Sequence, residues 1–180
     1  GADAVVLPGS KNTVDDLLDD VARTLDSARQ SADAGEYDRA LARCERAIAT
    51  VKETRATARE DAPDRVPDAE ATLDDATTLR ETIQAEHDAR QQATDALDTA
   101  EGGLDDAAAA VDGSRPEAAL ETLDGVAESL DTARASIADH EFPGVAERVA
   151  TLEQRQERLR QAAREARTRV PAEIPGVTRH

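Results

Sequence analysis

Residues 69–111 read AEATLDDATTLRETIQAEHDARQQATDALDTAEGGLDDAAAAV, and the spacing of the apolar residues in this run indicates the class of fold. Its apolar side chains return at steps of three or four residues, which is the period of an amphipathic helix. The pattern weakens only over the polar residues 86–90, and no proline interrupts it. It predicts helices over about 67–90 and 91–112, which can continue into one another. The apolar positions are Ala69, Leu73, Ala76, Leu79, Ile83, Ala93, Leu97, Ala100, Leu104, Ala107 and Val111.

The same spacing continues on both sides of this run. It predicts further helices over about residues 13–34, 37–61, 116–139 and 143–169. Thr13 and Asp16 resemble a capping box at the start of the first helix, and Gly35 is a natural end for it. The last helix carries a strict heptad, typical of coiled coils. Its seam positions are Val145, Val149, Leu152, Gln156, Leu159, Ala163, Ala166 and Val170.

An internal repeat organises these helices into two units. A shift of 79 residues places Leu18 on Leu97 and Leu25 on Leu104, so residues 13–90 and 91–169 each read as a three-helix unit. A coincidental match of two heptad patterns is the alternative to a true duplication. The expected fold is all-α, an antiparallel helical bundle or coiled coil of about five helices, with two three-helix units that share one long central helix. The layout resembles spectrin-type repeats, without their aromatic core residues.

The composition narrows the function classes. The chain of 180 residues has 39 acidic and 22 basic side chains and a formal net charge of −17, which argues against binding to nucleic acid or to an anionic membrane. No apolar run is long enough for a membrane span, no signal peptide is visible, and Cys44 has no disulfide partner. The 2 Lys against 20 Arg, and 22 Asp against 17 Glu, suggest a cytoplasmic protein of a halophilic archaeon.

The charge is unevenly distributed along the chain. Residues 61–141 carry a net charge of −17, whereas residues 142–180 carry +3. A basic last helix behind an acidic middle predicts that the two pack together within the molecule.

The beginning of the chain has a different pattern. Residues 2–17 read ADAVVLPGSKNTVDDL, which is a short buried-strand pattern followed by a loop and a helix start. The string resembles the strand–loop–helix of cobyric acid synthase, with Pro8, Gly9, Ser10, Lys11, Asn12 and Thr13 as the matching loop. The resemblance implies glutamine- and ATP-dependent amidation of corrinoids in cobalamin biosynthesis. It predicts an extended segment over residues 1–12 and a chain that is a fragment of such a protein, or a fusion with it, without its catalytic machinery.

No catalytic, cofactor-binding or metal-binding residues are identified. The family's glutaminase half uses a cysteine nucleophile on a tight turn, but Cys44 falls on the apolar face of a helix and is expected in the core. His87, His140 and His180 have no second ligand at metal spacing. Residues 35–41 resemble the inter-helix turn of a tetratricopeptide repeat, with Tyr37 expected to cover the turn.

The end of the chain, residues 170–180, reads as a Pro-containing linker and resembles those that precede catalytic domains in haloarchaeal kinase-like proteins. The sequence as a whole favours a non-catalytic scaffold or interaction module that binds protein partners or self-associates through its helical faces. The cobalamin-pathway amidotransferase is the competing interpretation.

Overall fold

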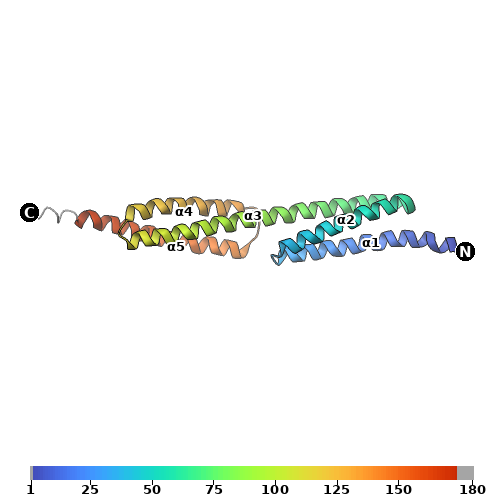
Figure 1. The fold of residues 1–180 in the computed structure, drawn as a ribbon, viewed down its shortest axis with the longest axis horizontal. Coiled ribbons are helices and arrows are strands. Elements are labelled where there is room, and N and C mark those ends of the chain that lie inside the picture. The colour runs from blue at the N-terminus through green and yellow to red at the C-terminus, as the bar shows by residue number, and fades with distance from the viewer. Residues whose placement is uncertain (1, 174–180) are drawn as a thin grey trace, which may run out of the picture. The chain divides into compact units, whose positions relative to one another are not determined.

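The computed structural model describes residues 2–173, with side chains described from residue 13 to residue 169. It contains α1 (Ala2–Asp33), α2 (Tyr37–Asp61), a 3₁₀ turn η1 (Pro63–Arg65), α3 (Val66–Asp112), α4 (Pro116–Ser136) and α5 (Pro143–Glu173) (Figure 1). No strand occurs within these limits. The predicted all-α class is therefore confirmed.

The chain divides into two compact units, Gly1–His87 and Asp88–His180. The sequence placed this division between residues 90 and 91. The division falls where the apolar pattern weakens, because the fully buried residues of α3 stop at Ile83 and resume at Ala93. Helix α3 supplies residues to both units.

The core of the first unit consists of three small clusters made by α1, α2 and α3. Most of its buried apolar side chains are alanines, and the larger side chains that are fully buried are Val14, Val21, Cys44, Val51, Thr54 and Ile83. Alanine removes little apolar area from water, so each cluster contributes modestly to stability. The three clusters comprise Ala28, Ala32, Tyr37, Ala40, Cys44 and Ile83; Val14, Ala58 and Ala62; and Val21, Ala47 and Val51.

The core of the second unit is one continuous cluster. Leu97 and Leu104 of α3 meet Leu123 and Leu130 of α4, and all four leucines are fully buried. Helix α5 contributes its predicted heptad seam, and the members of that seam that are buried are Val145, Val149, Leu152, Ala163 and Ala166. Gln156 interrupts the apolar seam and donates from Nε2 to the backbone oxygen of Leu123 at 3.3 Å.

The turn between α1 and α2 is built on Gly35, which has a φ of 83°. This left-handed conformation is accessible to glycine at low cost. It allows the amides of Gly35 and Glu36 to donate to Ala32 O at 2.9 Å and Ser31 O at 2.8 Å, which satisfies carbonyls at the end of α1. The predicted end of the first helix is therefore confirmed.

Several predicted boundaries are wrong. The segment 1–12 was expected to be extended, but α1 already begins at Ala2. A single strand without a neighbour leaves its backbone groups unpaired, whereas a helix pairs them locally. The helices predicted over 67–90 and 91–112 are one helix, α4 ends at Ser136 instead of residue 139, and α5 reaches Glu173, into the predicted linker. Residues 174–180 of that linker lie outside the described residues.

Two neighbouring glycines of α3 provide a test of the α3–α4 packing. A Cβ at Gly103 would lie 2.6 Å from Cγ2 of Val126, whereas a Cβ at Gly102 would meet no atom within 4 Å. Val126 is buried and stiff at χ1, so it cannot move away cheaply. We expect Gly102→Ala to stabilise the chain by about 0.5–1 kcal/mol through helix propensity. We expect Gly103→Ala to be less stable than Gly102→Ala by about 1–3 kcal/mol in urea unfolding. Equal stability of the two variants would contradict this contact.

Candidate functional site

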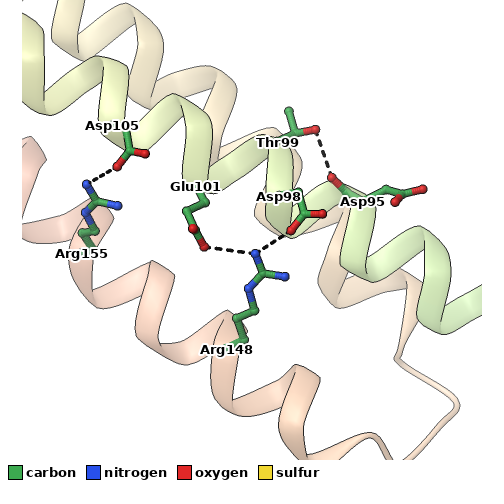
Figure 2. Close-up of polar contacts among 7 residues, drawn as sticks. All are labelled: Asp95, Asp98, Thr99, Glu101, Asp105, Arg148 and Arg155. Atoms are coloured by element: carbon green, nitrogen blue, oxygen red, sulfur yellow. Dashed lines mark hydrogen bonds and ion pairs between the residues drawn. The ribbon is translucent and has the colours of Figure 1, made fainter. Parts of the chain in front are cut away.

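A ladder of ion pairs joins α5 to α3 in the second unit (Figure 2). Nη2 of Arg148 lies 2.7 Å from Asp98 Oδ1 and 3.1 Å from Glu101 Oε2, and Nη2 of Arg155 lies 2.7 Å from Asp105 Oδ1. The hydrogen bond that Arg148 donates to Asp98 raises the pKa of the Arg148 guanidinium, against the opposing effect of burial. Because both the arginines and the aspartates are one heptad apart, the same contact repeats along the seam.

Further pairs surround this ladder, namely Arg134 with Glu153, Arg160 with Asp124 and Arg167 with Glu117. The prediction that the basic last helix packs against acidic helices of the same molecule is therefore confirmed. Most of the carboxylates in these pairs are well exposed, so each pair contributes about 1 kcal/mol or less. The ladder fixes the register of α5 on α3 and offers no chemistry of its own.

In the first unit, Arg29 of α1 forms a bidentate pair with Glu86 of α3. The Nη2–Oε2 and Nη1–Oε1 distances are 2.8 and 3.1 Å, and Arg29 also binds Asp33 through Nη2 at 2.7 Å. Hydrogen bonding to Glu86 raises the pKa of Arg29 despite partial burial. The Glu86 side chain is only 18% exposed, so the pair is shielded from solvent and holds α1 against α3.

Each of the described histidines stacks on an aromatic ring of its own unit. His87 lies against Tyr37 with 5.2 Å between ring centroids, and His140 lies against Phe142 at 5.3 Å. His180 is outside the described residues. Within those residues, no group of three or more His, Cys, Asp or Glu side chains could hold a metal ion. Tyr37 is buried at the start of α2, beside the turn that it was predicted to cover.

Cys44 is a core residue, as its position on the apolar face predicted. It is fully buried, in one cluster with Ala40 and Ile83. Burial raises the pKa of its thiol, which reduces the thiolate fraction that a nucleophile needs.

The residues of the loop motif lie within helix α1, so they do not form the loop that the resemblance predicted. The side chains of Pro8, Gly9, Ser10, Lys11 and Asn12 are outside the described part, and Thr13 is exposed.

A surface groove between α2 and α3 is the feature that sequence reasoning missed. Half-buried Ile48 and Leu73 line it, and charged and hydroxyl side chains surround them. The periodicity placed Ile48 on the core face of its helix, but the structure includes it in none of the core clusters of the described residues. The signal in the sequence that could have indicated this groove is Ile48, a large apolar residue close to the charged residues Glu45 and Lys52. The other lining residues are Asp74, Thr77, Thr78, Arg80 and Glu81.

No helix in the described part of the chain is long and apolar enough to cross a bilayer. Comparisons of the chain with protein-family models, with curated proteins and with solved structures found no match.

Proposed function

We propose that the chain is a non-catalytic helical interaction module that self-associates through the α2/α3 groove. The observation that supports this is the position of Ile48, which is a large apolar side chain left half-buried on the surface of a strongly charged protein. A second helical surface laid into the groove would cover Ile48 and Leu73. Helices dock into grooves in this way through side chains spaced by one or two turns.

The charges around the groove favour a second copy of the chain as the occupant. Its rim carries both signs, with Lys52 on α2 and Asp74 and Glu81 on α3. Lys52 makes no ion pair within the described residues, whereas Arg80 pairs with Glu45 at 3.2 Å. In a two-fold symmetric interface each surface meets itself, so Lys52 of each copy can pair with a rim carboxylate of the other.

Light scattering after size exclusion tests the proposal. In molar KCl we expect a species of twice the 19.2 kDa chain mass, and Ile48→Asp is expected to return it to the single-chain mass. Ala49→Asp adds the same charge at an exposed position outside the groove, and it should leave the mass unchanged. A single-chain mass up to about 1 mM, where even an interaction of about −4 kcal/mol is visible, would overturn self-association.

We also propose that the protein works at high salt. Its net charge of −17 disfavours the compact state through self-repulsion, which molar salt screens. Thermal unfolding followed by circular dichroism should show a higher Tm in about 3 M KCl than in about 0.1 M KCl. A Tm that does not rise with salt would contradict this adaptation.

The second candidate, a fragment or fusion of a cobyric acid synthase, rests on the string at residues 2–17. Glutamine hydrolysis by the purified chain would support it, provided that Cys44→Ala abolished the hydrolysis. We expect no hydrolysis, because Cys44 is fully enclosed by core side chains.

A further inference from the structure

A second groove, between α1 and α2, is rich in arginine. Its volume is about 320 Å³. The residues from α1 are spaced by three, four and seven positions, which places them along one helix face. Arg23 of α1 and Arg43 and Arg46 of α2 bring three guanidinium groups to the groove, which contains a single carboxylate, that of Asp20. The lining side chains are Asp20, Arg23, Thr24, Ser27, Arg43 and Arg46.

Neutral partners hold the central arginine of this groove. Arg43 is half-buried and donates to the backbone oxygen of Ser27 at 3.3 Å and to Oγ of Ser31, which is itself 5% exposed. Elsewhere in the unit, Arg29 and Arg80 each pair with a carboxylate. The guanidinium of Arg43 is thus fixed in place while its charge is left uncompensated.

The rest of the groove adds to this positive charge. Asp20 forms an ion pair with Arg23, and among the described residues neither Arg43 nor Arg46 has a carboxylate within ion-pair distance. Ser27 contributes a hydroxyl group. Arginine presents its N–H groups as a planar fork that matches the oxygens of tetrahedral anions. A multiply charged ligand therefore balances the charges of the Arg43 and Arg46 guanidinium groups better than a single carboxylate does.

We propose that this groove binds a phosphate group, either as free phosphate or as the phosphomonoester of a small molecule. The phosphate oxygens accept hydrogen bonds from Arg43 and Arg46, with Arg23 at the edge beside Asp20. The groove extends beyond these two arginines to Thr24 and Ser27, which leaves room for a polar substituent on the ester.

Calorimetric titration of the full chain at constant ionic strength tests the proposal, with inorganic phosphate in one arm and glycerol phosphate in the other. We expect saturable binding that Arg43→Gln and Arg46→Gln each weaken about tenfold, the loss of one charge-assisted contact. Arg55→Gln is the matched control, because Arg55 is a half-buried arginine of α2 outside the groove, with no ion pair in the described range. It should leave the affinity within about twofold.

Circular dichroism separates loss of binding from loss of folding. Arg43 contacts buried Ser31, so its variant can be destabilised, whereas Arg46 is exposed and its variant should keep the parent's helical signal. Tighter binding of glycerol phosphate than of phosphate assigns the site to phosphomonoesters, and the reverse order assigns it to the free anion. The proposal is overturned if neither ligand binds, or if Arg55→Gln weakens binding as much as Arg46→Gln does.

Discussion

Replacing Ile83 with alanine is expected to lower the free energy of unfolding of the first unit by about 2–5 kcal/mol. Ile83 is fully buried, and its cluster otherwise contains mostly alanine together with Tyr37 and Cys44. The alanines and Cys44 are too short to fill the space, whereas Leu41 and Leu79, which pack against this cluster from partly buried positions, can fill part of it. The variant therefore retains part of the cavity, and the cost should lie within that range.

Hydrogen exchange measured by mass spectrometry can localise the loss. Amides of α1 and α2 should lose protection in Ile83→Ala, while those of α4 and α5 keep it, because the core of the second unit contains no residue of the first. Ile48→Ala is the matched control when measured at a chain concentration low enough to keep the parent a single chain, since it then removes the same atoms from a half-buried position outside the core clusters. A cost for Ile48→Ala as large as that for Ile83→Ala would contradict this assignment of the core.

Arg29→Ala is expected to destabilise the first unit by about 1–3 kcal/mol, because it leaves the shielded carboxylate of Glu86 without its bidentate partner. Chemical denaturation in high salt is the appropriate measurement, since salt screens this pair less than an exposed one. Arg39→Ala removes an exposed pair with Glu36 and should change stability by less than about 1 kcal/mol.

A double variant shows whether Arg29→Ala is unstable because Glu86 has lost its partner or because the ion pair itself was favourable. Arg29→Met combined with Glu86→Leu removes both charges and keeps apolar bulk, so it should recover most of the stability lost in Arg29→Ala. If the double variant is as unstable as the single one, Glu86 was not the group left unsatisfied.

The helices were predictable because their signal is local. Periodicity located the apolar faces of α2 and α4. Gly35 and the prolines mark the ends of helices because their own backbone preferences favour a helix start or end. The division of the chain also followed from a local signal, the polar stretch around His87. The extended segment over residues 1–12 was wrong because a strand needs neighbouring strands to pair with, and the periodicity of the following residues predicts only helices.

The two grooves could not be predicted in the same way. A helical repeat indicates which side chains face inward, but it does not indicate how far two helices stand apart. Ile48 follows the same spacing as Cys44 and Val51, yet it remains half-buried while they are enclosed. Likewise, Arg23 and Arg43 come together only because the turn at Gly35 folds α2 back along α1.

The alanine-rich interior of the first unit also has a thermal consequence. The heat-capacity increment of unfolding grows with the apolar surface that becomes exposed, and it sets the curvature of stability against temperature. A core of Ala28, Ala40, Ala47 and Ala58 exposes less such surface than the leucines of the second unit. The free energy of unfolding of the first unit should therefore change less with temperature. The unit should keep its modest stability over a broad range of temperature.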